Sequence, residues 1–181
     1  MARYPNAIWD PANPANEGGP MGKIRLVVDH IEQGTESGTN AWFQNVKAKV
    51  SAHFGISKLG QVFQFVDTDK IAWAEQDYND VAVSIEHEGL SGQAFTDQQV
   101  AAEAKLGAWI HKTHGVPVQR TTVPTGTGWI THAELGVAGG NHPECPGAIA
   151  TKQLPAILKA INKVIDPGHL PRPVFPPSKA E

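Results

Sequence analysis

The sequence has one cysteine, Cys145, among its 181 residues, so no disulfide can form within a single chain. It has no run of about 18 apolar residues, which excludes a membrane-spanning helix, and we expect no membrane insertion. It has no excess of basic residues: 15 Lys and Arg stand against 18 Asp and Glu, which argues against a nucleic-acid partner. Residues 1–22 lack the basic start and apolar stretch of a signal peptide, so we expect a protein made in the cytoplasm without one.

What the sequence does contain is enough for one compact domain, with 40% hydrophobic residues to form its core. Residues 1–22 combine proline with Asn and Gly and are expected to form an extended N-terminal arm. Residues 167–181 include five prolines and are expected to be a linker or tail. The domain itself is therefore assigned to residues 23–166.

Hydrophobic patterning within this domain predicts strands that alternate with helices. Thr96 and Gln99 form a capping-box pattern at the start of the clearest helix, and Gly115 ends it. This alternation is typical of an α/β fold, with a mixed central β-sheet flanked by helices. We expect strands over residues 24–30, 50–57, 61–66, 81–86 and 129–132, and helices over residues 41–48, 96–114 and 154–165.

Histidines follow several of the predicted strands, and eight histidines occur in all. His30 and His132 come at strand ends, and Cys145 follows in a loop stiffened by proline. A catalytic zinc ion takes three protein ligands from His, Cys or a carboxylate and keeps a fourth position open, which these residues would provide. Spacing alone leaves the alternative open that the histidines are hydrogen-bonded structural residues and that the cysteine is a small buried hydrophobe.

Five sequence blocks resemble the type 2 N-acetylmuramoyl-L-alanine amidases, a family that includes phage lysins and shares its fold with the peptidoglycan recognition proteins. The resemblance runs from about Ile24 to Val164 with the blocks in family order. It implies a zinc-dependent hydrolase that cleaves the amide bond between N-acetylmuramic acid and L-alanine of the stem peptide in peptidoglycan. The blocks are VVDHIEQG, VSAHFGISKLGQVFQFV, VAVSIEHEG, ITHAEL and ECPG.

Carried over residue by residue, the resemblance implies that His30, His132 and Cys145 hold the zinc ion. Glu86 corresponds to the carboxylate that some members use as a general base. His53 corresponds to a histidine of the substrate groove, and Trp73 is expected to bind substrate as well.

The chain departs from the family pattern two residues before its third expected zinc ligand. Many members have Lys or Thr there, and this chain has Pro143, which offers neither a side-chain donor nor an N–H. His142 is the nearest residue that can stabilise the oxyanion in catalysis. The alternative is an exposed loop histidine with no such role.

Two other functions stay open at this stage. One is a binding module that recognises peptidoglycan without cutting it, although binding-only relatives tend to lack the cysteine ligand. The other is a zinc hydrolase that acts on a different amide. We expect the catalytic domain of a phage endolysin, acting on the bacterial cell wall as a monomer.

Overall fold

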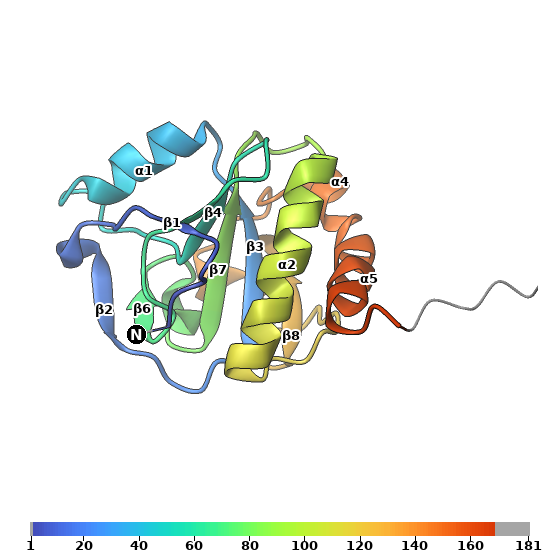
Figure 1. Ribbon diagram of the computed structural model, residues 1–181. Helices are drawn as coiled ribbons and strands as arrows, with labels where there is room; N and C mark the ends of the chain where they lie inside the picture. Colours follow the sequence, from blue (N-terminus) through green and yellow to red (C-terminus); the bar gives the residue numbers. More distant parts are fainter. Residues whose placement is uncertain (1, 169–181) are drawn as a thin grey trace, which may run out of the picture.

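The computed structural model describes residues 2–168, so the expected tail lies almost entirely outside the described residues. A six-stranded sheet forms the centre, with the strand order β1-β5-β4-β7-β3-β8. All neighbouring strands in it run parallel except β4 and β5, which are antiparallel, so the expected mixed sheet flanked by helices is confirmed (Figure 1). The strands are β1 (Ile8–Trp9), β3 (Leu26–Ile31), β4 (Phe54–Ile56), β5 (Val62–Gln64), β7 (Ala82–His87) and β8 (Gly128–Thr131).

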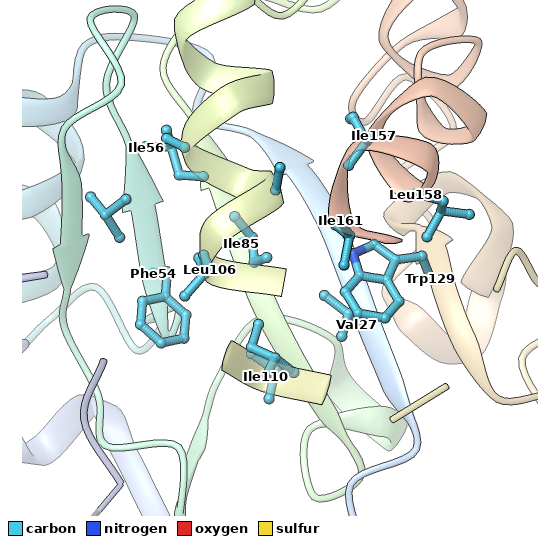
Figure 2. Close-up of a cluster of buried hydrophobic side chains, with 14 of the residues drawn as sticks. Val27, Phe54, Ile56, Ile85, Leu106, Ile110, Trp129, Ile157, Leu158 and Ile161 are labelled. Atoms are coloured by element: carbon cyan, nitrogen blue, oxygen red, sulfur yellow. The ribbon is translucent and has the colours of Figure 1, made fainter. Parts of the chain in front are cut away.

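Two long helices, α2 (Asp97–His114) and α5 (Leu154–Ile165), lie on one face of this sheet (Figure 1). The Thr96–Gln99 capping box forms as expected, and Gly115 ends α2 in a left-handed conformation. Between these helices and the sheet lies the main hydrophobic core (Figure 2). Its fully buried large side chains include Phe54, Ile56, Ile85, Leu106, Ile110, Trp129, Ile157 and Ile161.

Shorter elements cover the other face and the ends of the sheet. A second sheet pairs β2 (Glu17–Pro20) antiparallel with β6 (Lys70–Ala72), which the sequence patterning did not predict. Within the described residues, no helix is both long and apolar enough to cross a membrane. The remaining helices are α1 (Glu36–Gln44), α3 (His132–Leu135) and α4 (Ala148–Thr151), with 3-10 turns η1 (Pro14–Asn16), η2 (Gln76–Tyr78) and η3 (Val137–Gly139).

Several element boundaries differ from the sequence-based expectation. The first small helix covers residues 36–44 and not 41–48, because the Thr35 side chain caps it by accepting from the Gly38 N–H. The strand expected over residues 50–57 is restricted to β4. His132 begins α3 and does not end a strand.

The expected N-terminal arm packs closely on the domain. Tyr4 is buried, and its backbone N–H donates to the side chain of Gln64. Residues 8–9 form β1, a two-residue strand at one edge of the main sheet. At the other edge, the segment around Arg120 runs beside β8. The Thr121 N–H donates to the Trp129 carbonyl, and the Trp129 N–H donates to the Gln119 carbonyl.

The contact between α2 and α5 depends on Gly107. A Cβ atom at this position would lie 2.6 Å from Ile161 Cδ1 and 3.1 Å from the Trp129 ring. We expect Gly107→Ala to lower the melting temperature by several degrees, because overpacking costs about 1–3 kcal/mol and outweighs the gain in helix propensity of about 1 kcal/mol. Ile161→Val removes the closest atom, so the double variant should recover part of the loss. A melting temperature that rises in Gly107→Ala alone would contradict this packing argument.

Candidate metal centre and active site

The expected site residues gather at the carboxyl ends of the central parallel strands. His30 lies near the end of β3, and Glu86 lies beside it in register on β7. His132 directly follows β8, which pairs with the other side of β3. Because parallel strands place their carboxyl ends at the same end of the sheet, residues more than 100 positions apart in sequence meet there.

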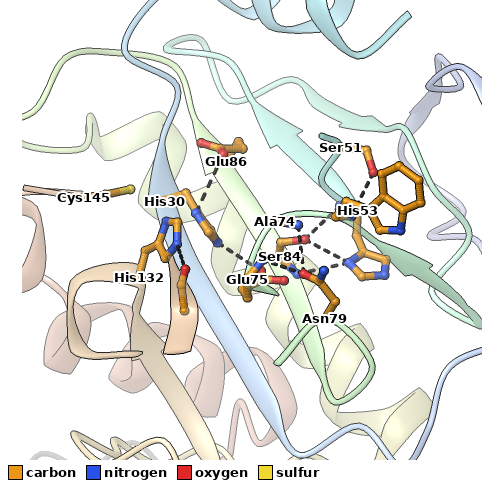
Figure 3. Close-up of polar contacts among 12 residues, drawn as sticks. His30, Ser51, His53, Ala74, Glu75, Asn79, Ser84, Glu86, His132 and Cys145 are labelled. Carbon is orange, nitrogen blue, oxygen red and sulfur yellow. Dashed lines mark hydrogen bonds and ion pairs between the residues drawn. The ribbon is translucent and has the colours of Figure 1, made fainter. Parts of the chain in front are cut away.

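Cys145 reaches the same place from the loop that follows η3. Its carbonyl accepts from the Ala133 N–H at 2.8 Å, and its Sγ accepts from the Ile31 N–H at 3.4 Å. The ligand-type atoms of His30, His132 and Cys145 all lie within 4.8 Å of one another (Figure 3). The three residues singled out as zinc ligands are therefore brought together by the fold.

Hydrogen bonds fix which ring nitrogens of the two histidines stay free. His30 Nε2 lies 3.0 Å from Glu75 Oε1, and His132 Nε2 lies 2.8 Å from the Gly139 carbonyl oxygen (Figure 3). A carbonyl oxygen only accepts, so His132 carries its proton on Nε2. In both residues Nδ1 is left as the nitrogen able to bind a metal ion.

The protonation of the two histidines suits a metal site. Burial lowers the pKa of both His30 and His132 to about 3, so both imidazoles are neutral near pH 7. Burial raises the pKa of the Cys145 thiol, with the Glu86 carboxylate adding to the rise. A metal cation between these residues would stabilise the thiolate form of Cys145.

Glu86 is positioned beside the metal-ligand cluster, with its Oε1 3.8 Å from His30 Nδ1 (Figure 3). Burial raises its pKa to about 8, and the carboxyl groups of Glu75 and Glu36 contribute. A positive charge at the neighbouring ligands would lower that pKa again. A carboxylate in this environment can exchange protons near neutral pH, as a general base requires.

His142 lies at the rim of the site. Its side chain is exposed, and its ring centroid is 4.5 Å from that of His132. The Gly-rich stretch around Gly140, which has a φ of +101°, turns the loop so that His142 comes back over the metal-ligand cluster. This placement is compatible with donation to a substrate oxygen.

A cleft of about 780 Å³ opens in front of these residues. Trp73, the residue expected to bind substrate, lines it, and the exposed Trp42 borders it too. His30, Glu86, His132, His142 and Cys145 also line this cleft. The chemistry-bearing residues therefore face a space that a peptide or sugar can enter.

The cleft floor next to Glu86 is acidic. Glu32 lines the cleft, and Glu36 lies behind it with both carboxylate oxygens buried and without a hydrogen-bond partner. A Cβ atom on Gly55 of β4 would lie 2.7 Å from Glu36 Oε2, so the glycine leaves the space that this carboxyl occupies. Burial raises the pKa of both Glu32 and Glu36 above the ordinary value of a glutamate, and the closeness of the two carboxyl groups adds to the rise at Glu32.

His53 does not lie where the resemblance placed it. The side chain is completely buried and is absent from the cleft lining, since its Nδ1 accepts from the Ser84 N–H at 3.1 Å and its Nε2 donates to the Lys70 carbonyl at 3.0 Å. Burial lowers its pKa to about 4. We therefore correct the expected substrate contact to a supporting position behind the cleft wall.

Glu75 contacts His30 at the candidate site and was not singled out from the sequence. It is fully buried in the turn before η2, where the Asn79 side chain accepts from its backbone N–H. Burial raises its pKa well above the ordinary value. The only sequence signal is an acidic residue two positions after Trp73, which nothing links to His30 until the chain is folded.

Comparison with known proteins assigns a family to this arrangement. Residues 20–148 match the family described as N-acetylmuramoyl-L-alanine amidase. A relative, N-acetylmuramoyl-L-alanine amidase A of Achromobacter lyticus, is 34% identical over 116 residues, which cover 62% of this chain and 66% of that protein. The aligned part of the chain thus spans slightly less than two thirds of this curated relative.

Solved structures agree with the fold. A selenomethionine derivative of AmpD superposes with a TM-score of 0.68 at 20% identity, covering 86% of this chain and 96% of its own. The hydrolase AmiA of Staphylococcus aureus, solved with its ligand, has a TM-score of 0.64 at 13% identity and covers 91% of this chain and 85% of its own. PlyL has a TM-score of 0.63 at 16% identity, with coverages of 86% and 96%.

Proposed function

Because this chain belongs to the N-acetylmuramoyl-L-alanine amidase family, we propose that it hydrolyses the amide bond between N-acetylmuramic acid and L-alanine of the stem peptide. The observation that carries the proposal is the convergence of two neutral histidines, one cysteine and one carboxylate at the mouth of a cleft. A module that only binds peptidoglycan has no need for this set of groups.

The donor set supports zinc as the cofactor. One thiolate and two imidazoles form a ligand set that zinc favours, and three protein ligands are typical of its catalytic sites. His30, His132 and Cys145 would hold the ion. When bound, zinc lowers the pKa of water toward about 7 and polarises an amide carbonyl.

The remaining chemistry belongs to residues of the chain. Glu86 takes a proton from the attacking water and passes it to the leaving amine of L-alanine. His142 donates a hydrogen bond to the substrate oxygen as negative charge develops there. Trp73 provides a flat apolar surface in the cleft, against which the substrate packs.

The test is to incubate the purified protein with purified peptidoglycan and to follow new L-alanine amino termini and new reducing sugars separately. The proposal expects amino termini without reducing sugars. A protein that sediments with peptidoglycan but releases no amino termini would be a binding module. Release from a different amide alone would identify another zinc hydrolase.

We expect His142→Ala to lower kcat by roughly 10- to 10³-fold, since loss of one oxyanion donor removes a few kcal/mol of transition-state stabilisation. Metal content and melting temperature should change little, because the ring is exposed and lies outside the ligand set. Steady-state kinetics with a soluble muropeptide measure the effect. His111→Ala, a histidine of α2 outside the cleft, is the control. Wild-type kcat in His142→Ala would rule out the donor role.

We expect Glu75→Ala to weaken zinc binding by roughly 10- to 100-fold, the usual effect of losing a group that orients a metal-binding histidine. The reason is the contact of Glu75 Oε1 with His30 Nε2, which keeps Nδ1 directed at the metal-ligand cluster. Competition with a coloured chelator gives the affinity. Glu75→Gln retains an oxygen at the same place and should lose less. Equal affinities in all three proteins would show that Glu75 does not position His30.

We propose further that the substrate is assembled cell wall, as for an endolysin. Support comes from Trp42, a residue 51% exposed at the cleft rim, whose indole offers a surface for a second glycan strand or peptide. Rates on intact sacculi and on soluble muropeptides test this proposal. An enzyme that uses only the soluble substrate would act in recycling instead.

A further inference from the structure

A second group of metal-ligating side chains lies inside the fold, on the opposite face of β3 from the cleft. Successive residues of a strand point to opposite faces, so Asp29 faces α2 while His30 faces the cleft. His87 lies on the same inner face of β7, and Glu103 reaches it from α2. All three side chains have no exposed surface.

The inner cluster lacks the positive charge that its carboxyl groups require. Neither oxygen of Asp29 nor Oε1 of Glu103 has a partner at hydrogen-bond geometry, although Glu103 lies close to both Asp29 and the Trp129 indole. Within residues 2–168, no lysine or arginine hydrogen-bonds to either carboxyl, and the nearby Arg120 is paired with Glu134 at 2.5 Å and 2.6 Å. A buried charge without a partner costs several kcal/mol, so something must neutralise the cluster.

The tautomer of His87 indicates where that neutralising charge lies. His87 Nδ1 is 3.2 Å from the His30 carbonyl oxygen, which only accepts, so Nδ1 carries the proton. In the neutral ring Nε2 then has a lone pair, and it lies 3.1 Å from Glu103 Oε2. Two lone pairs this close require a proton or a cation between them.

The geometry agrees with a cation. Two ligands about 2.1 Å from the same ion lie about 3.0–3.4 Å apart, which matches the spacing of His87 Nε2 and Glu103 Oε2. Ligand-type atoms of Asp29, His87 and Glu103 all lie within 4.8 Å of one another. A metal-binding histidine commonly donates its second ring N–H to a backbone carbonyl, as His87 does here.

We propose that Asp29, His87 and Glu103 hold a divalent transition-metal ion, such as Zn²⁺ or Mn²⁺, in the interior of the protein. Two carboxylates balance its charge, and one imidazole with two carboxylates is a ligand set that suits these ions. The ion would tie β3 and β7 to α2. Through His87 it would also hold the backbone of His30, the first ligand of the cleft site.

The competing explanation is neutralisation by protons. Burial raises the pKa of Asp29 well above its ordinary value and that of Glu103 to about 8, while Asp29 and the Trp129 indole limit the rise at Glu103. Without a cation, the two carboxyls would therefore carry protons. Binding of a metal ion would release those protons.

Metal analysis of the intact protein, produced with Zn²⁺ and Mn²⁺ in the medium, separates the two explanations. The proposal expects Glu103→Gln to contain one equivalent of metal less than wild type. The matched control, Asp97→Asn at the exposed start of α2, should keep the wild-type content. A content that Glu103→Gln leaves unchanged would overturn the proposal.

A second variant keeps the test decisive if Glu103→Gln does not fold. Cys145→Ser removes a ligand of the cleft site alone. The proposal therefore expects this variant to retain one equivalent of metal, which should resist dialysis against a chelator because the inner site is fully buried. A folded Cys145→Ser protein without metal would overturn the inner site. If the proposed cleft zinc is itself wrong, wild type and Cys145→Ser should contain the same single, chelator-resistant equivalent.

Discussion

Replacing Cys145 with serine should weaken zinc binding in the cleft by more than about 100-fold and reduce amide hydrolysis to near background. Loss of a residue that merely orients a ligand already costs roughly 10- to 100-fold, and here a ligand itself is removed. The serine hydroxyl is a poor substitute, since zinc binds thiolate sulfur and a neutral hydroxyl carries no charge to replace it. Metal titration of the purified variant and kinetics on peptidoglycan measure the two effects.

The adjacent position provides the control. Glu144→Gln changes an exposed residue of the same loop and leaves the ligand set intact, so zinc affinity should match wild type. Wild-type zinc affinity in Cys145→Ser would mean that another group completes the site. The assignment of the third ligand would then be wrong, although the fold would stand.

Replacing Glu86 with glutamine should lower kcat by about 10²- to 10⁴-fold while zinc stays bound. Glutamine has nearly the same shape as glutamate, but its amide cannot take a proton from water near neutral pH. The side chain lies beside His30 and outside the ligand set, so the metal site should survive the change. Kinetics and metal content measured on the same sample separate proton transfer from metal loss.

Glu88→Gln is the matched control, because Glu88 lies two residues further along the chain and does not line the cleft. It should retain wild-type turnover. Near-normal turnover in Glu86→Gln would show that another group moves the proton. A parallel loss of zinc would instead show that Glu86 helps to hold the metal.

The sequence was most informative where local rules and tertiary packing agree. Thr96, Gln99 and Gly115 mark both ends of α2, since capping depends on neighbours within a few residues. The helix expected over residues 41–48 lies at residues 36–44 instead, since its sequence, ESGTNAWFQ, has weak apolar periodicity from which its bounds can be predicted. The pairing of residues 8–9 with β5 depends on contacts more than 50 residues apart, which local patterning cannot predict.

The same contrast between local patterns and contacts of distant residues applies to the site. His30, His132 and Cys145 could be proposed from strand ends and the family blocks, because residues that follow parallel strands lie together at the carboxyl end of the sheet. Glu75 could not be proposed, since its role depends on a hydrogen bond to a residue 45 positions away. The sequence also could not indicate that His53 would be buried, because Ser84 and the Lys70 carbonyl come from separate segments.

The two edges of the main sheet bear on how the protein behaves at high concentration. A long, exposed edge strand is a template on which another chain can add a strand and begin to aggregate. Here β1 offers only two residues at one edge. At the other edge, the backbone of Trp129 in β8 is already engaged by Gln119 and Thr121. Within residues 2–168, neither edge of the main sheet presents a long open row of N–H and C=O groups, so intermolecular β-sheet growth from this sheet has little to start from.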